Sequence, residues 1–377
     1  MQAINIDDLR AAAKKRLPRA IFELMDGGAQ DETTLRANRE DFGKWQFRTR
    51  TLTDVSTRDQ SITLFGQRHA SPLILAPTGL AGLFSRRGEL AAARAAEKFG
   101  VPYCLSTMST CTIDEITRET APPKWFQLYV LRDRELTRDF INRARASHCT
   151  ALVLTVDTKV QGPHERDMRN GFTVPPRFTA ATLMDFALHC SWLFDVAFGP
   201  RITFKNFVGS NAASTNAMTI TQFIAGQYDL SVNWRDVEWF KSVWGGPVLL
   251  KGILTAEDAR LALDHGADGV IVSNHGGRQL EGAISAVQAL PEIAQTVGDR
   301  MDVILDGGIL RGADEVRARA LGSKACMIGR AWLYGLGAEG QTGVERALEI
   351  LRDEIDVTLT LLGRPTFSEI DRGILQG

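Results

Sequence analysis

The chain has 377 residues, with 44 Lys and Arg against 45 Asp and Glu and a formal net charge of -1. Its 44% hydrophobic and 24% charged residues are typical of a soluble globular protein and exclude a disordered or fibrous one. The balanced charge, without any run of Lys or Arg, argues against a nucleic-acid-binding protein.

The five cysteines, at positions 104, 111, 149, 190 and 326, form no CxxC pair. Their scatter excludes a disulfide framework and a zinc ribbon and is typical of a reducing compartment. Because the first 20 residues lack an apolar core and contain Asp7 and Asp8, we expect neither a signal peptide nor a transit peptide. We also expect no membrane span, since no stretch of 18 residues is apolar and free of charged residues. The expected location is the cytoplasm.

Residues 1–60 are predicted to be helical, with Asp7 or Asp8 capping the first helix and Pro18 opening the second. From residue 72 onward, short apolar runs alternate with segments of helical spacing. Most of these runs lack polar alternation, which is typical of strands buried on both faces. The predicted strands are 72–77, 101–105, 124–128, 151–156, 247–251, 268–273, 302–306 and 324–328.

Eight strand-then-helix units predict an α/β fold in which a parallel sheet closes into a (β/α)8 TIM barrel. An open doubly wound sheet is the alternative, but its nucleotide motif GxGxxG is missing. The prediction is one domain over 1–377. Residues 160–235 form a long insertion after strand four, which predicts a lid or a contact surface.

Polar residues follow the carboxyl ends of all eight predicted strands, where barrels of this type carry their catalytic groups. A capping or turn role explains any one of them but not the whole set, so we predict a functional site at this end. The set is Thr78, Ser106, Gln127, Tyr129, Thr155, Asp157, Lys251, Ser273, Asn274, His275, Asp306, Gly307, Gly308, Gly329 and Arg330.

The densest cluster is SNHGGRQLEG, residues 273–282. His275 suits a general base near neutral pH, and Asp157 at a neighbouring strand end would orient it if the barrel forms. The planar fork of Arg278 suits a carboxylate or phosphate. Gly329 and Arg330 come after strand eight, where barrels place a phosphate site.

Two other chemistries are disfavoured. The six histidines are dispersed and no Cys/His group has metal-ligand spacing, so no metal is expected. No GxSxG motif occurs, which argues against a serine nucleophile.

These residues resemble the FMN-dependent L-2-hydroxy acid oxidases and dehydrogenases, most closely the bacterial L-lactate and mandelate dehydrogenase branch. The SNHGGRQ block is the most specific part, and the resemblance covers nearly the whole chain. It is carried by LPRAIFELMDGGAQDETTLRAN (17–38), APTGLAG (76–82), WFQLYVLRDR (125–134), LTVDT (154–158), LKGIL (250–254), SNHGGRQLEG (273–282), LDGGI (305–309) and IGRAWLYGL (328–336).

The resemblance implies oxidation of an L-2-hydroxy acid to a 2-oxo acid with FMN as cofactor, and a homotetramer. It makes His275 the base and Asp157 its partner, and places Arg278 and Tyr129 on the substrate. Lys251 would sit at the N1/O2 edge of the flavin, where reduction accumulates negative charge. The other flavin contacts it implies are Thr78, Gly79, Ser106, Gln127, Thr155 and Ser273 at the ring, Asp306 at the ribityl chain, and Gly308, Gly329 and Arg330 at the phosphate.

The sequence departs from the family pattern at three positions. Leu24 stands where the family usually has a Tyr that helps to bind the substrate carboxylate, and His164 stands where it has an active-site Arg. Leu310 replaces an Arg on the phosphate, which leaves Arg311 as the candidate substitute. Neutral drift in a lactate-type enzyme and a changed, bulkier acid substrate both explain the first two changes.

Three questions stay open from sequence alone. The alternative functions are the same flavin chemistry on an amino-acid-derived or natural-product substrate, and a flavin-binding scaffold without turnover. Oxygen, a quinone or another carrier would reoxidise the flavin. The aromatic segment 183–208 is predicted to be a lid or subunit interface, with peripheral contact at the inner face of the membrane as the alternative. Its aromatic residues are Phe186, Trp192, Phe194, Phe198, Phe204 and Phe207.

Overall fold

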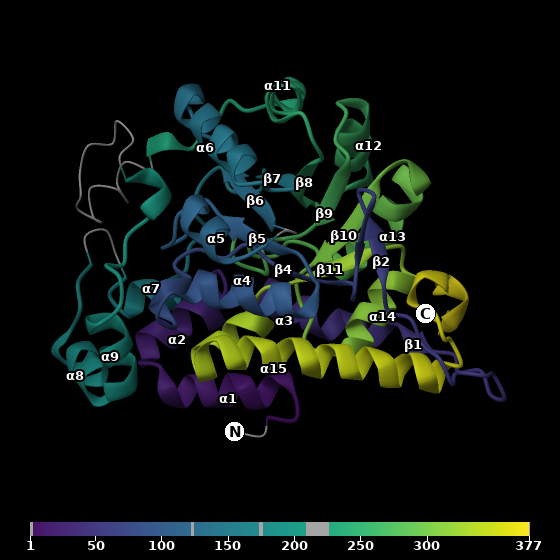
Figure 1. The fold of residues 1–377 in the computed structure, drawn as a ribbon, viewed down its shortest axis with the longest axis horizontal. Coiled ribbons are helices and arrows are strands. Elements are labelled where there is room, and N and C mark those ends of the chain that lie inside the picture. The colour runs from purple at the N-terminus through teal and green to yellow at the C-terminus, as the bar shows by residue number, and fades with distance from the viewer. Residues whose placement is uncertain (1–2, 122–123, 173–175, 209–225, 377) are drawn as a thin grey trace.

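The computed structural model describes residues 3–121, 124–172, 176–208 and 226–376. Eight parallel strands close into a barrel in the order β10-β11-β4-β5-β6-β7-β8-β9 (Figure 1). This confirms the predicted (β/α)8 barrel, and every strand ends within two residues of its predicted range. The strands are β4 (Leu73–Leu75), β5 (Tyr103–Ser106), β6 (Lys124–Tyr129), β7 (Ala151–Thr155), β8 (Val248–Ile253), β9 (Gly269–Val272), β10 (Asp302–Asp306) and β11 (Ala325–Ile328).

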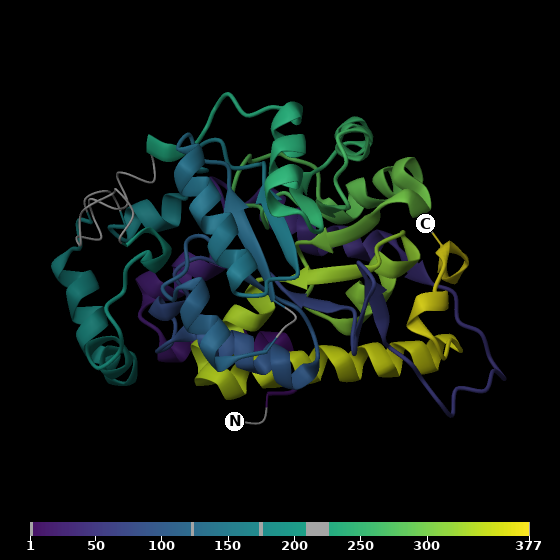
Figure 2. The same ribbon diagram turned by 45° about the horizontal axis from the view of Figure 1, so that its top comes forward.

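The strands are apolar on both faces because each is covered on both. Every residue of β4, β5, β7, β9 and β11 is buried. Helices surround the barrel on its outer face, and Figure 2 shows them above and below the strands. They are α4 (Gly88–Phe99), α5 (Ile113–Glu119), α6 (Arg134–Ala146), α11 (Trp234–Trp244), α12 (Ala256–Asp264), α13 (Ala286–Val297), α14 (Gly312–Ala320) and α15 (Arg330–Leu362).

Three helices precede the barrel: α1 (Ile6–Arg16), α2 (Arg19–Asp26) and α3 (Thr33–Glu40). The predicted cap of the first helix was wrong. Asn5 caps α1 by accepting the N–H of Asp8 at 2.8 Å, so Asp7 and Asp8 lie in the first turn. Pro18 directly precedes α2 as predicted. Helix α1 packs along α15 beneath the barrel (Figure 1).

The end of the N-terminal segment is not helical. After the short 3-10 turn Asp41–Lys44, β1 (Gln46–Phe47) pairs antiparallel with β12 (Leu375–Gln376) near the C-terminus. A hairpin of β2 (Ile62–Leu64) and β3 (Gln67–His69) then leads into the barrel. Sequence patterning gave no signal for these short pieces.

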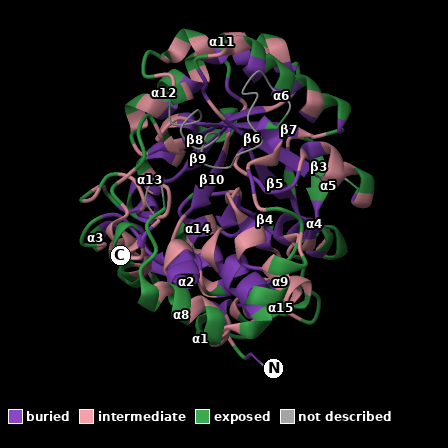
Figure 3. Ribbon diagram, turned by 90° about the vertical axis from the view of Figure 1, so that its left-hand side faces the viewer, coloured by how far each residue is buried: buried purple, intermediate pink, exposed green. Residues whose placement is uncertain are grey.

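The insertion after β7 contains α7 (Glu165–Arg169), α8 (Ala180–Leu188), α9 (Cys190–Ala197) and a 3-10 turn at Lys205–Phe207. Its residues 173–175 and 209–225 lie outside the described part. Helices α8 and α9 lie at the lower left edge of the molecule in Figure 1 and carry many exposed residues, which are green in Figure 3. No helix in the described ranges is long and apolar enough to cross a membrane.

Glu315 on α14 is expected to make stability depend on pH. Its side chain is buried, only 1% exposed, and burial raises its pKa from 4.5 to about 8. Between these pH values the folded protein keeps a proton that the unfolded chain releases, so the free energy of unfolding falls as the pH rises. We expect Glu315→Gln to remove this loss and to be more stable than the parent by roughly 4 kcal/mol at pH 8.

The measurement is urea denaturation of both proteins at pH 5 and pH 8. The gain should fall to about 1 kcal/mol at pH 5, because that pH lies only half a unit above the pKa of 4.5 for the unfolded chain. An equal difference at both pH values would contradict the prediction.

Candidate active site

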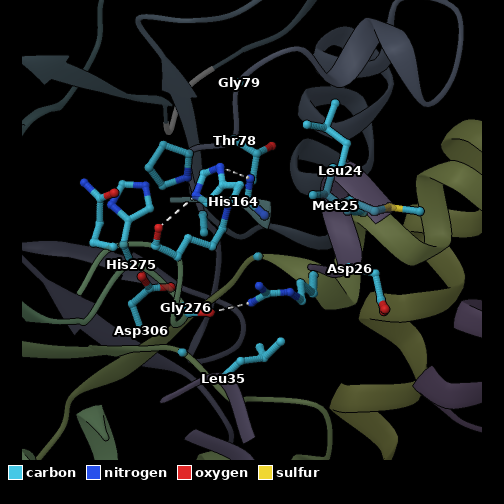
Figure 4. Close-up of a pocket in the computed structure, with 18 of the residues that line it drawn as sticks. Leu24, Met25, Asp26, Leu35, Thr78, Gly79, His164, His275, Gly276 and Asp306 are labelled. Atoms are coloured by element: carbon cyan, nitrogen blue, oxygen red, sulfur yellow. Dashed lines mark hydrogen bonds between the residues drawn. The ribbon is translucent and has the colours of Figure 1, made fainter. Parts of the chain in front are cut away.

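A cavity of about 760 Å³ lies at the carboxyl ends of the barrel strands. Figure 4 shows Leu24 and Met25 of α2 on the side of this cavity opposite His275 and Asp306. The cavity gathers most of the residues that the sequence predicts for the site. Those that line it are Leu24, Thr78, Gly79, Tyr129, His164, Lys251, His275, Arg278, Asp306, Gly308, Gly329 and Arg330.

His275 and Asp157 form a hydrogen-bonded pair, as the barrel prediction required. The Nδ1 of His275 lies 3.0 Å from Oδ1 of Asp157. A carboxylate only accepts, so Nδ1 carries the proton and Nε2 is left as the basic nitrogen. Burial opposes the charge on Asp157, but the nearby His275 and Lys251 outweigh it and lower the pKa of the carboxyl. Asp157 is therefore ionised and suited to stabilise an imidazolium.

The backbone of the SNHGG loop explains its two glycines. His275, Gly276 and Gly277 all have positive φ, at 59°, 64° and 74°. A Cβ on Gly276 would lie 2.8 Å from Nη1 of Arg330, and one on Gly277 would lie 2.6 Å from the backbone N of Leu35. Only glycine satisfies both the conformation and the space. The strained conformation of His275 is held by its N–H, which donates to Oγ of Ser273 at 3.0 Å.

Lys251, Ser273 and Asp306 form a buried charged triad between β8, β9 and β10. The Nζ of Lys251 lies 2.7 Å from Oδ2 of Asp306 and donates to Oγ of Ser273 at 3.1 Å. Burial opposes its charge, but Asp306 and Asp157 outweigh burial and raise the pKa of Lys251. A permanent positive charge is thus fixed beside the cavity.

Arg278 points into the cavity and is held by groups from two other segments. Its Nη1 donates to the carbonyl of Gly27 at 2.8 Å, and Nη2 lies 3.4 Å from Nδ1 of His164. The Nε2 of His164 donates to the carbonyl of Arg278 at 2.8 Å, so this ring braces both ends of the arginine. Asp167 lies 3.3 Å from His164 and 3.7 Å from Arg278. Burial, followed by the charge of Arg330, lowers the pKa of Arg278 to about 10.

Arg166 does not take the place of the family arginine at His164. Its guanidinium reaches Oδ2 of Asp26 at 3.3 Å and pairs with Glu32. Arg10 and the hydroxyl of Tyr334 bind the same Asp26, the hydroxyl at 2.8 Å. Although Arg166 lines the cavity, its charge is directed to this network.

One wall of the cavity is apolar and aromatic. Tyr129 and Tyr228 meet edge to face, with ring centroids 5.6 Å apart. Burial, and next the neighbouring Tyr228, raises the pKa of Tyr129, so its hydroxyl is neutral and available to donate. Other apolar side chains that line the cavity are Leu24, Leu80, Phe84, Met108, Phe204 and Leu333.

The predicted flavin-ring contacts fall into two groups. Thr78 lines the cavity, and its Oγ1 is buried without a hydrogen-bond partner among the described residues. Ser106, Gln127 and Thr155 instead form a buried chain behind the lining, with bonds of 3.0 Å and 2.9 Å. A Cβ on Gly79 would lie 3.0 Å from that of Met108. Gly79 therefore packs too closely against Met108 to carry a side chain without a shift of its neighbour.

Two glycines and one arginine form the predicted phosphate end of the cavity. Arg330 donates from Nη1 to the carbonyl of Gly276 at 2.9 Å and from Nη2 to that of Gly27 at 2.7 Å. Its Nε is buried and unpartnered within the described ranges. Arg311 is not brought to the cavity, since its side chain binds Glu354 at 2.8 Å on the surface.

The described residues contain no group of three or more His, Cys, Asp or Glu that could hold a metal ion. Sequence reasoning missed several lining residues, chiefly Tyr228 in the insertion, Met108, and Arg39 on α3. It also missed Asp167 as the partner of His164. None of these follows a strand directly or belongs to a short motif, so no local signal marked them.

The chain is similar to known proteins over nearly its whole length. The sequence model of the family described as FMN-dependent dehydrogenase matches residues 13–377. An L-lactate dehydrogenase of Caulobacter vibrioides (strain NA1000 / CB15N) is 45% identical over 369 residues, covering 98% of this chain and 96% of the relative.

Two solved structures extend the comparison. One, of the monotopic membrane protein (S)-mandelate dehydrogenase, has a TM-score of 0.96 at 40% identity and covers 100% of both chains. The other is a soluble mutant of the membrane-associated (S)-mandelate dehydrogenase from Pseudomonas putida. It has a TM-score of 0.86 at 39% identity and covers 100% of this chain and 99% of that one.

Proposed function

The chain belongs to the FMN-dependent dehydrogenase family, and we propose from this premise that its substrate is an L-2-hydroxy acid with an apolar side chain. It is an FMN-dependent oxidoreductase acting on L-2-hydroxy acids such as lactate or mandelate. The apolar and aromatic lining of the cavity, which includes Leu24, Met108 and Tyr228, is the observation that favours a bulky acid.

The residues present fit FMN. A flavin phosphate requires cationic and N–H donors, and Arg330 has a buried Nε without a partner in the described chain. The Oγ1 of Thr78 is likewise buried and free to bond a polar ring edge. Gly308, Gly329 and Arg330 would hold the phosphate, Asp306 the ribityl chain, and Thr78, Gly79 and Lys251 the ring. Ser106, Gln127, Thr155 and Ser273 would support these contacts from behind.

The chemistry divides between the cofactor and the chain. When bound, FMN supplies the two-electron acceptor for the substrate C2–H bond. Nε2 of His275 removes the proton of the C2 hydroxyl, and the imidazolium that forms is stabilised by Asp157 at 3.0 Å. Arg278 and Tyr129 hold the carboxylate and fix the C2 position. The cation of Lys251 would stabilise the negative charge that reduction places on the N1/O2 edge of the flavin.

His164 and Leu24 adapt the carboxylate site to a bulkier acid. His164 braces Arg278 through its backbone carbonyl and its guanidinium, so it orients the carboxylate ligand and does not add a second permanent cation. Leu24 adds apolar surface where a tyrosine would add a hydroxyl. Fewer polar contacts to the carboxylate are offset by burial of the substrate side chain.

The test is anaerobic loss of the yellow flavin absorbance with glycolate, L-lactate and L-mandelate. Each buried methylene contributes about 0.8 kcal/mol, and a phenyl ring several times that, so we expect kcat/KM for L-mandelate to exceed that for glycolate by about 100-fold or more. Leu24→Tyr should reduce this ratio, while the volume-conserving Leu24→Met should preserve it. Equal rates with glycolate and L-mandelate would contradict the proposal. Reduction by none of the three acids would instead favour an unusual substrate or a scaffold without turnover.

We further propose that α8 and α9 rest on a lipid bilayer. Phe194 and Phe198 are 63% and 67% exposed and stack on each other, and Leu183, Met184, Leu188 and Leu193 are exposed beside them. Large apolar side chains exposed together on two adjacent helices are typical of a membrane or protein interaction site. The similarity to a monotopic membrane protein supports a bilayer as its occupant. A membrane-soluble acceptor such as a quinone would then take the electrons.

Four of the six aromatic residues assigned to this contact from sequence do not belong to it. Trp192 and Phe207 are buried, and Nε1 of Trp192 donates to the carbonyl of Leu83 at 2.7 Å. Phe204 lines the cavity, and Phe186 packs against Trp192. Helical periodicity turns these side chains inward, which the aromatic count alone could not reveal.

Sedimentation with phosphatidylglycerol and phosphatidylethanolamine vesicles tests this contact. We expect the protein to pellet with vesicles, and Phe194→Ser to lower the bound fraction severalfold. Leu361→Ser, on an equally exposed residue of α15, is the control and should bind like the parent. The proposal would be contradicted if the parent did not bind vesicles, or if Phe194→Ser and Leu361→Ser bound them equally.

The homotetramer remains a prediction.

A further inference from the structure

Of the predicted phosphate ligands that line the cavity, Arg330 carries the one positive charge. Leu310 cannot donate from its side chain, and Arg311 is turned to Glu354. Each terminal nitrogen of Arg330 donates one N–H, to the carbonyl of Gly276 and to that of Gly27. Its Nε and the second N–H of each terminal nitrogen remain for a ligand. Because one guanidinium carries a single charge, a second cation is needed to balance a phosphate dianion.

The N-terminus of α14, which follows the DGG turn, does not supply this second charge. Helix α14 begins at Gly312, and its preceding N–H groups, which could bind an anion, are already bonded. Asp314 accepts the N–H of Leu310 at 3.2 Å and that of Arg311 at 2.9 Å. Asp314 is buried and adds a carboxyl close to where the phosphate would bind.

We propose that Arg39 of α3 is the second cationic ligand of the FMN phosphate, opposite Arg330. This inference rests on the proposed placement of the phosphate at Gly308 and Gly329. Arg39 lines the same cavity, and its Nη1 donates to the carbonyl of Gly308 at 3.3 Å. It also pairs with Asp314 and so offsets the charge of that carboxyl.

Helix α3 is fixed against the strand-end loops closely enough to position this arginine. A Cβ on Gly308 would lie 2.0 Å from the backbone O of Asn38, so helix and turn are in direct contact. The side-chain amides of Asn38 and Asn274 exchange two hydrogen bonds, of 2.7 Å and 2.8 Å. Figure 4 shows Leu35, one turn earlier on α3, facing the same part of the cavity as Gly276 and Asp306.

The guanidinium of Arg39 has capacity for a further ligand. Within the described chain both of its contacts use Nη1, which leaves Nε and Nη2 for phosphate oxygens. The other cavity arginines are committed elsewhere: Arg10 and Arg166 to Asp26, and Arg278 to Gly27. Arg36 donates to the carbonyl of Asp31 and makes no contact with the DGG turn.

Flavin binding to the full-length chain, stripped of its cofactor, tests the assignment without any turnover. Quenching of flavin fluorescence gives Kd for FMN and for riboflavin, which lacks the phosphate. The Arg39→Gln variant loses one charge-assisted contact to the phosphate, so its Kd for FMN should rise about 10- to 100-fold. Its Kd for riboflavin should stay unchanged. Adding Leu310→Arg to the Arg39→Gln variant should recover much of the lost FMN affinity.

Two matched variants separate this role from general effects. Arg36→Gln, one turn away on the same helix, and Arg311→Gln, adjacent to Leu310, should both bind FMN like the parent. Equal weakening of FMN and riboflavin by Arg39→Gln would assign Arg39 to the packing of the turn and overturn the inference. Unchanged FMN binding would overturn it as well. A parent chain with no preference for FMN over riboflavin would overturn the phosphate placement itself.

Discussion

Replacing His275 with Gln is expected to slow reduction of the bound flavin by substrate by about 100- to 10,000-fold, the usual range for loss of a general base. Glutamine keeps hydrogen-bonding groups but cannot take the hydroxyl proton. Rapid anaerobic mixing with substrate, followed by flavin absorbance, measures the rate. The flavin spectrum before mixing should match the parent, since the loss concerns proton transfer and not cofactor binding.

Asp157→Asn is the graded control for this prediction. It retains the size of the side chain but removes the charge that stabilises the imidazolium at 3.0 Å. Loss of one buried charge-assisted hydrogen bond predicts a smaller reduction, about 10- to 100-fold. If His275→Gln reduced the flavin at the parent rate, the base would have to be another residue.

Arg278→Met is expected to lower kcat/KM by about 30- to 4000-fold, mainly through KM, because truncating a buried charged partner costs about 2–5 kcal/mol. In Arg278→Met the substrate carboxylate would enter a buried site that no longer contains the arginine cation. Arg278→Lys should recover only part of this, since an ammonium cannot serve both the carbonyl of Gly27 and the substrate in the same planar geometry.

A substrate without the carboxylate charge distinguishes binding from folding. The parent should prefer the acid to its methyl ester, and Arg278→Met should lose that preference because the guanidinium creates it. Arg166→Gln lines the same cavity but faces Asp26 and Glu32, so it should keep the preference. A preserved preference in Arg278→Met would place the carboxylate elsewhere.

The barrel could be predicted from the sequence because its strands are buried on both faces. Such strands appear as mostly apolar runs, as 151–156 does, and the chain contains eight of them, separated by helical segments and, after the fourth, by the long insertion. Residues at the ends of parallel strands converge in space, so His275 and Asp157 could be paired before any coordinates. Their Nδ1–Oδ1 distance of 3.0 Å agrees with that prediction.

Local patterns failed where function depends on which way a side chain turns. Arg311 was the candidate phosphate ligand by its proximity to Leu310, yet it binds Glu354. Of the aromatic residues in 183–208, Phe204 faces the cavity while Phe194 faces solvent. Sequence spacing does not report such choices when the partner is remote.

The sequence by itself determined the family and the barrel, and it predicted catalytic residues at the strand ends, since the barrel follows from periodicity and the family from short motifs. Only the tertiary structure decided what surrounds them. Arg39 meets Gly308, and Tyr228 meets Tyr129, across long separations in sequence. No local rule relates such residues, because packing of helices and the insertion over the barrel mouth brings them together. Substrate size and phosphate binding depend on these contacts.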